Sequence, residues 1–213
     1  MLSSVTHPIR LGDAAEERFW LGVQAAERFF MGEAEVQKAL ERLVRELDAQ
    51  GIPYAIIGAM ALNEFGYQRV TVDVDVLLTP EGLAAFKAAH LGWGYSEQFA
   101  GSRSLRDTEY GVNIDVVLTG SYPGDGKPKP VAFPDPGTAA ERGARVALLP
   151  LTLLVELKLA SGMTAPDRLK DLADVQELIR INRLPRTLAV ELNPFVRDKY
   201  IELWRAVADR PSE

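Results

Sequence analysis

The sequence contains no cysteine and only two histidines, His7 and His90. Without cysteine the chain can form neither a disulfide nor a thiolate metal site, and two separate histidines offer no histidine-pair metal site or catalytic dyad. The N-terminus lacks a basic segment followed by an apolar run, and no apolar stretch approaches the length needed to span a bilayer. These absences favour a protein of the reducing cytoplasm with no membrane partner.

Positive charge is also scarce, because 24 Lys and Arg stand against 30 Asp and Glu and give a net charge of −6. This balance argues against a broad nucleic-acid-binding surface. Residues 121–170 differ, with seven basic and five acidic side chains, so a local anion-binding surface remains open. The composition, 47% hydrophobic and 25% charged, is that of a single ordinary globular domain or of two small domains.

What the sequence does contain is a strand with two carboxylates, in the run from Val72 to Leu78. Side chains alternate along a strand, so Asp73 and Asp75 share one face while valines 72, 74 and 76 face the core. The two carboxylates would lie about 6.6 Å apart, close enough to share two divalent cations about 3.5–4 Å from each other. Asp is a poor strand former, so this pairing indicates function.

Two further stretches gain meaning beside this strand. Residues 52–57 indicate a buried strand that runs into Gly58 and a helix at 60–65, a junction where backbone N–H groups can approach a phosphate. Residues 112–118 indicate a second strand, with Asp115 among apolar neighbours. Each stretch taken alone is more often a plain turn or a strand with a capping Asp.

Together these residues resemble the signature of the DNA polymerase β-like nucleotidyltransferases, a Gly-[Gly/Ser] turn, an [Asp/Glu]-x-[Asp/Glu] strand and a later Asp strand. Gly58, Asp73, Asp75 and Asp115 match it. Ala59 departs from it, because the family usually has Ser or Gly there, and a hydroxyl that would touch the triphosphate is absent.

The small bacterial branch, which includes AbiEii-like and minimal nucleotidyltransferases, is the most similar. Its Arg-x-[Ser/Thr]-x-Asp-x-Asp run matches the run of Arg69, Thr71, Asp73 and Asp75. Its helical lysine and Lys/Arg-Asp-x-x-Asp helix are similar to the residues Lys158, Lys170, Asp171 and Asp174. The resemblance extends over roughly residues 53–181.

The resemblance implies an α+β fold, a small mixed or antiparallel sheet with flanking helices and a C-terminal helical part. We expect N-terminal helices at 1–51 that pack on the core, a nucleotidyltransferase core at 52–149 and the helical part at 150–213. Periodicity and capping signals predict helices over the ranges 33–50, 80–90, 151–161, 167–182 and 193–208. Residues 120–130, rich in Gly and Pro, predict a mobile loop near the site.

The activity implied is Mg²⁺-dependent transfer of a nucleoside monophosphate from a nucleoside triphosphate (NTP) to a hydroxyl. Asp73, Asp75 and Asp115 would hold two Mg²⁺ ions, and the expected nucleotide contacts are Gly58, Ala59, Arg69, Thr71 and Lys158. Lys170, Asp171 and Asp174 are further candidates. The acceptor is open between an RNA 3′ end such as that of tRNA, a protein and a small molecule.

Simpler interpretations stand beside these roles. Lys158 would otherwise be a lysine whose stem covers the core while its ammonium reaches water, and Arg69 a member of a surface ion pair. Asp171 and Asp174 would pair with Lys170 or Arg168.

For the whole protein, the alternative is a catalytically weak or inactive binding module, for instance one component of a toxin–antitoxin pair with a cognate partner protein. A purely structural domain would leave the acidic cluster unexplained. An aromatic stripe at residues 19–30 favours packing on this domain over a homodimer contact.

Overall fold

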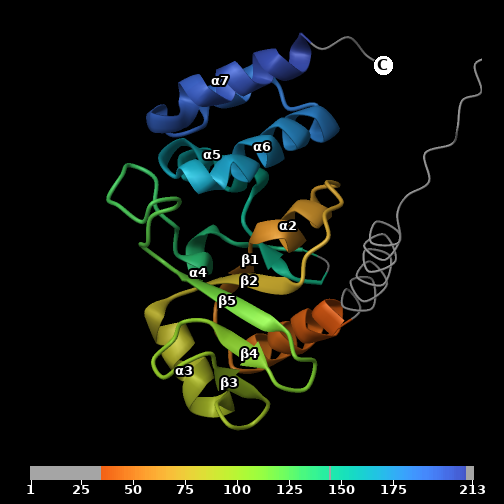
Figure 1. The fold of residues 1–213 in the computed structure, drawn as a ribbon, viewed down its shortest axis with the longest axis vertical. Helices are drawn as coiled ribbons and strands as arrows, with labels where there is room; N and C mark the ends of the chain where they lie inside the picture. The colour runs from red at the N-terminus through yellow and green to blue at the C-terminus, as the bar shows by residue number, and fades with distance from the viewer. Residues whose placement is uncertain (1–34, 144, 210–213) are drawn as a thin grey trace, which may run out of the picture.

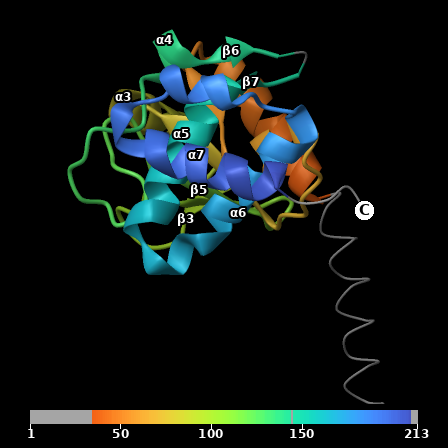
Figure 2. The same ribbon diagram turned by 90° about the horizontal axis from the view of Figure 1, so that it is seen from above.

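The computed structural model describes residues 35–143 and 145–209, and the predicted aromatic stripe lies outside these residues. Seven strands form one mixed sheet in the order β3-β4-β5-β2-β1-β7-β6; Figure 1 labels β1 to β5, and Figure 2 labels β6 and β7. β2 pairs in parallel with β5 and β1 with β7, and the other pairs are antiparallel. The strands are β1 (Tyr54–Ile56), β2 (Asp73–Leu78), β3 (Tyr95–Glu97), β4 (Leu105–Asp107), β5 (Asn113–Leu118), β6 (Glu141–Arg142) and β7 (Ala147–Leu148).

Helices occupy the ranges that the capping signals predicted, with small shifts at their ends. Thr79 caps α3 by accepting a hydrogen bond from the Gly82 backbone N–H at 2.9 Å, and Pro80 is the first residue of that helix. The helix at residues 35–49 is followed by Gly51 in the left-handed region at φ +63°. The other helices are α2 (Gly58–Glu64), α3 (Pro80–His90), α4 (Pro136–Ala139), α5 (Leu151–Thr164), α6 (Leu169–Asn182) and α7 (Pro194–Ala208), with 3₁₀ turns at Pro166–Arg168 and Arg186–Val190.

The sheet separates two hydrophobic cores, because its strands alternate between them. Val74 and Val76 face the core made with helix 35–49 and α3, while Leu77 faces the core made with α2, α5, α6 and α7. In Figure 1, α7 lies farthest from the sheet with α5 and α6 beneath it, and Figure 2 looks down through these layers. The α+β fold with a mixed sheet and flanking helices is therefore confirmed.

Two local expectations differ from the structure. Val72 was expected in the core, but 58% of it is exposed, because the strand begins only at Asp73. The helix predicted at 60–65 begins two residues earlier, at Gly58 itself. Of the helices in the described part of the chain, none combines the length and apolarity that a membrane crossing demands.

Candidate active site

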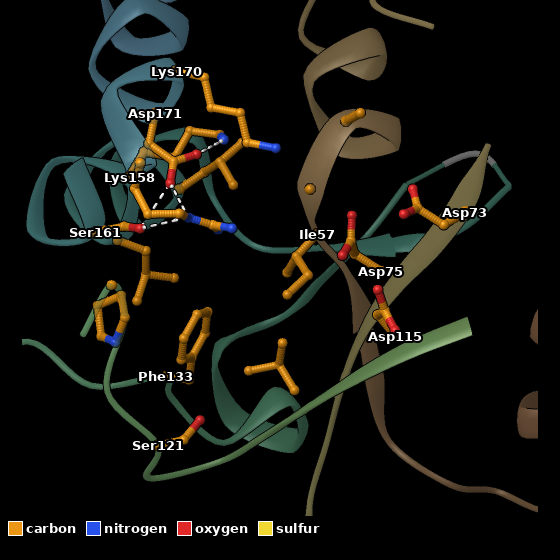
Figure 3. Close-up of a pocket in the computed structure, with 18 of the residues that line it drawn as sticks. Ile57, Asp73, Asp75, Asp115, Ser121, Phe133, Lys158, Ser161, Lys170 and Asp171 are labelled. Atoms are coloured by element: carbon orange, nitrogen blue, oxygen red, sulfur yellow. Dashed lines mark hydrogen bonds and ion pairs between the residues drawn. The ribbon is translucent and has the colours of Figure 1, made fainter. Parts of the chain in front are cut away.

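The three predicted carboxylates lie together on one face of the sheet. The parallel register of β2 and β5 places Asp75 opposite Asp115 and Asp73 opposite Asn113. Figure 3 shows Asp75 and Asp115 side by side, with Asp73 farther along its strand. Residues two apart on a strand point the same way, and facing residues on neighbouring strands do so too, so the sequence spacing and the register together gather this acidic wall.

Two hydroxyl groups hold the outer carboxylates of this wall. The Thr71 hydroxyl donates to Oδ1 of Asp73 at 2.5 Å, and the Ser104 hydroxyl donates to Oδ1 of Asp115 at 2.8 Å. Thr71 also lines the pocket, and its expected contact with the nucleotide stays a prediction. Ser104 was missed by sequence reasoning, because nothing local marks a serine between two short strands.

Asp75, at the centre, is in the least favourable environment for a charge. Burial and the neighbouring charges of Asp73 and Asp115 raise the pKa of Asp75 to about 6, although Lys158 and Arg168 partly oppose this. Two carboxylates nearby disfavour ionisation of a third. The site therefore carries a carboxyl group that a bound cation would stabilise in its charged form.

The position of the Asp75 carboxylate requires a residue without a side chain at position 58. Gly58 has φ +65°, and a Cβ atom at this position would collide with Oδ2 of Asp75. The backbone N–H of Ile57 also donates to the Asp75 carbonyl at 3.0 Å, which fixes the turn against the strand. The glycine thus leaves room for the carboxylate, and its expected contact with phosphate stays a prediction. Ala59 follows it and lines the same pocket.

A charge network around the buried residues Lys158, Asp171 and Asp174 forms the opposite, basic wall of the site. The Lys158 ammonium donates to Asp171 Oδ1 at 2.9 Å and to Asp174 Oδ2 at 2.7 Å. Arg69 also donates to both carboxylate oxygens of Asp174, and Arg168 to Oδ2 of Asp171. Three positive charges against two negative ones leave this network with a net charge of +1.

This network differs from the simpler interpretations of Lys158, as a lysine that reaches water, and of Arg69, as a member of a surface ion pair. The Lys158 ammonium bonds two carboxylates, and Lys158 is only 8% exposed, so this residue does not simply extend its charge into bulk water. The partner of Arg69, Asp174, is 2% exposed, so this is no surface pair. Burial would raise the pKa of Asp171, but Lys158, Ser161 and Arg168 outweigh it and lower that pKa below its ordinary value. Asp171 is therefore held as an anion.

Arg69 connects the two walls. Its backbone N–H and C=O both bond to the Asn63 side chain on α2, and its guanidinium bonds Asp174 on α6. Two residues later, Thr71 holds Asp73. The segment that leads into the acidic strand is thus fixed to α2 and to the C-terminal helices.

A pocket of about 850 Å³ separates the walls. Asp73, Asp75 and Asp115 line one side, and Lys158, Arg168, Lys170 and Asp171 line the other. Figure 3 shows Lys170 reaching from α6 into this space. The structure therefore brings every predicted site residue to this pocket except Asp174, which supports it from behind.

The acidic wall fits a divalent cation in the type and charge of its groups. Asp73 and Asp115 accept side-chain hydrogen bonds only from hydroxyls, and none of the three carboxylates forms an ion pair within the described residues. Carboxylate oxygens are the ligands that Mg²⁺ prefers. Residues 35–143 and 145–209 hold no group of three or more His, Cys, Asp or Glu already arranged as metal ligands. Binding by all three would require their side chains to turn toward a common point.

Comparison with known proteins gives structural matches only: no protein-family model and no curated protein matches the sequence. ANT(2″)-Ia in complex with adenylyl-2″-tobramycin matches with a TM-score of 0.48 and 12% identity, over 79% of this chain and 96% of that chain. An antigenic nucleotidyltransferase-like protein from Paracoccidioides brasiliensis matches at 0.47 and 17% identity, over 70% and 77%. Protein JHP933 from Helicobacter pylori matches at 0.45 and 15%, over 82% and 79%.

Proposed function

We propose that this protein transfers a nucleoside monophosphate from an NTP to a hydroxyl group of an acceptor, with the help of divalent cations. The observation that supports this most is the pairing of two walls of opposite charge across one pocket. A structural domain gains nothing from three unpaired carboxylates gathered at one place, because they repel one another. A nucleotide with its metal ions offers charges of both signs to such a pocket.

Asp73, Asp75 and Asp115 would hold the metal ions, the expected two Mg²⁺, whose chemistry is to neutralise charge and polarise the α-phosphate. Asp115 takes the proton of the acceptor hydroxyl, and Ser104 keeps its carboxylate turned toward that hydroxyl. The acceptor oxygen then forms a bond to the α-phosphorus, the bond to the β-phosphate oxygen breaks and pyrophosphate leaves.

The basic wall offsets the charge of the triphosphate. Lys170 forms no ion pair within the described residues, and the network of Lys158 contributes a net positive charge beside it. Lys158 and Arg69 were expected to contact the nucleotide directly. Their carboxylate partners favour a different division of roles, in which Lys170, which has no such partner, meets the phosphates and Lys158 and Arg69 hold the basic wall in place.

For the acceptor, the strand beside Asp115 favours a negatively charged molecule, such as an RNA end. Arg103 and Arg106 are exposed, and neither forms an ion pair within the described residues. Of the nearby carboxylates, Glu97 pairs with Lys87, and Asp107 and Glu109 share Arg42 with Glu46. The guanidinium groups of Arg103 and Arg106 are therefore available to bind a phosphate group of such an acceptor.

Incorporation of label from α-³²P-labelled NTPs tests the proposal, with Mg²⁺ and with total RNA, protein or small-molecule extract as the acceptor. We expect the wild type to label one of these fractions and Asp73→Asn to label none while it keeps its melting temperature. The exposed carboxylate Asp198 on α7 supplies a matched control, because Asp198→Asn should label as well as wild type. Labelling by Asp73→Asn would refute the proposal.

The second candidate function, a nucleotide-binding module without transfer, is favoured by Ala59. Saturation with NTP at about a hundred times its dissociation constant stabilises a protein by about 2.7 kcal/mol, which is about 5–10 °C for a domain of this size. Such a rise with no label transferred to any acceptor would support the module. The narrower assignments, to the AbiEii-like branch, to a toxin–antitoxin pair, to a homodimer and to the cytoplasm, stay predictions.

A further inference from the structure

An apolar surface, the floor of the pocket, lies between the two charged walls. The roles proposed for the acidic and basic walls give this floor no function. Two of its members are the aromatic residues Tyr122 and Phe133, and the rest are Ile57, Val117, Leu154 and Leu157. Figure 3 shows the Phe133 ring directed into the space between the acidic cluster and the Lys158 network. Metal ions and phosphates require charged or polar partners, so an apolar floor serves a different part of a ligand.

The chain after β5 folds back on itself and thereby places both aromatic residues. The Gly120 N–H donates to the Phe133 carbonyl at 2.8 Å, and the Phe133 N–H donates to the Ser121 carbonyl at 2.9 Å. Thr119 adds a side-chain bond to the Pro134 carbonyl at 3.2 Å. These bonds hold the two limbs of the loop side by side, with Tyr122 on one limb and Phe133 on the other.

The loop is anchored to α5 at its far end. The Lys129 ammonium donates to the Pro123 carbonyl, to Asp125 and to the Thr164 hydroxyl of α5, and its side chain is only 5% exposed. Gly124 packs so closely on α5 that a Cβ atom there would come within 2.7 Å of the Ser161 carbonyl. The loop expected to be mobile is thus tied to the helix that carries the basic wall.

We propose that Tyr122 and Phe133 form a subsite for the nucleobase, a subsite that rests on the proposed nucleotidyl transfer. A nucleotide has a polyanionic part and a flat, largely apolar part, and this pocket offers charged walls for the first and an aromatic floor for the second. Aromatic rings bind bases by stacking on their faces. The anchoring through Lys129 holds the rings at a fixed place relative to the phosphates.

Binding of NTPs and of inorganic tripolyphosphate separates the base from the phosphates. Each of the four NTPs and tripolyphosphate would be measured with Mg²⁺ by competition against a labelled NTP, for wild type, Tyr122→Ala and Phe133→Ala. We expect each variant to weaken binding of the preferred NTP by about 5- to 150-fold, the range of one stacked base. Affinity for tripolyphosphate should change by less than about twofold, because it has no base to lose.

Two further variants keep the outcome interpretable. Phe133→Leu retains an apolar side chain and removes the flat ring, so it should lose NTP affinity while keeping the melting temperature. Phe99→Ala removes an aromatic ring that is 69% exposed in the hairpin between β3 and β4, and it should bind every ligand as wild type does.

Equal losses for NTP and tripolyphosphate, or no loss for either, would overturn the base subsite and leave nucleotidyl transfer standing. A wild type that binds neither ligand would instead refute the proposed function.

Discussion

Replacement of Asp75 by Asn should stabilise the fold while it removes activity. The pKa of Asp75 is raised from 3.8 to about 6, so the folded state holds this proton more tightly than the unfolded chain does. Above about pH 6 the carboxyl is ionised in both states, and the folded state then bears the whole penalty of the buried charge. Below about pH 4 it is protonated in both states, and the penalty disappears.

The magnitude follows from the shift. A change of about 2 units corresponds to about 3 kcal/mol, and solvent screening of this half-buried group reduces it to about 1–2 kcal/mol. For a domain of this size that is a rise in melting temperature of about 2–8 °C for Asp75→Asn at pH 8. At pH 4 the neutral carboxyl and the amide should differ little.

Thermal melts of wild type and Asp75→Asn from pH 4 to pH 8 measure this difference directly, without Mg²⁺ and with a chelator present. Asp198→Asn, on exposed surface, is the control and should show no gain that grows with pH. A difference between Asp75→Asn and wild type that stays constant with pH, or that shrinks as pH rises, would refute the electrostatic reasoning. Added Mg²⁺ should then narrow the gap, because a bound cation stabilises the ionised wild-type cluster.

Three further predictions concern the supports of the site. Gly58→Ala should destabilise the fold by about 2–4 kcal/mol in urea melts, because its methyl group would meet the Asp75 carboxylate at a positive φ; an unchanged midpoint would contradict this. Asp174→Ala should cost about 3–5 kcal/mol, because it leaves the buried Lys158 and the half-buried Arg69 without their shared partner, and a loss below about 1 kcal/mol would contradict this. Ser104→Ala should keep the melting temperature but slow nucleotidyl transfer, because Asp115 loses the hydrogen bond that orients its carboxylate. Full activity of this variant would show that Ser104 has no part in transfer.

Local patterns predicted the parts of the site that one strand or one turn encodes. Alternation along β2 placed Asp73 and Asp75 on one face, and a β-branched run placed Asp115 on a second strand. The Thr79-Pro80 signal gave the start of α3 because capping involves only neighbouring residues. Alternation gave the wrong prediction for Val72, which is exposed because it precedes the first residue of β2 and is not part of the strand.

Partners far apart in the chain could not be predicted in this way. Arg69 and Asp174 are 105 positions apart, and their contact depends on how α6 packs against the rest of the fold. In the sequence, Lys158 is the one cation in a largely apolar segment. Its two partners, Asp171 and Asp174, lie on the next helix, α6. From the sequence alone, Lys170 or Arg168 was an equally reasonable counterion for these two aspartates. Ion pairs between helices require the packing geometry, which alternation and capping do not contain.

The shared carboxylate of Asp174 connects the C-terminal helices directly to the segment that leads into β2. It bonds Lys158 on the basic wall and Arg69 on the segment that leads to the acidic wall. Arg69 in turn precedes Thr71, which holds Asp73. A displacement of α6 would therefore disturb both walls at once, by loss of a counterion on one side and of an anchor on the other. Residues from both sides of the predicted division at residues 149 and 150 line the pocket, and the division itself stays a prediction.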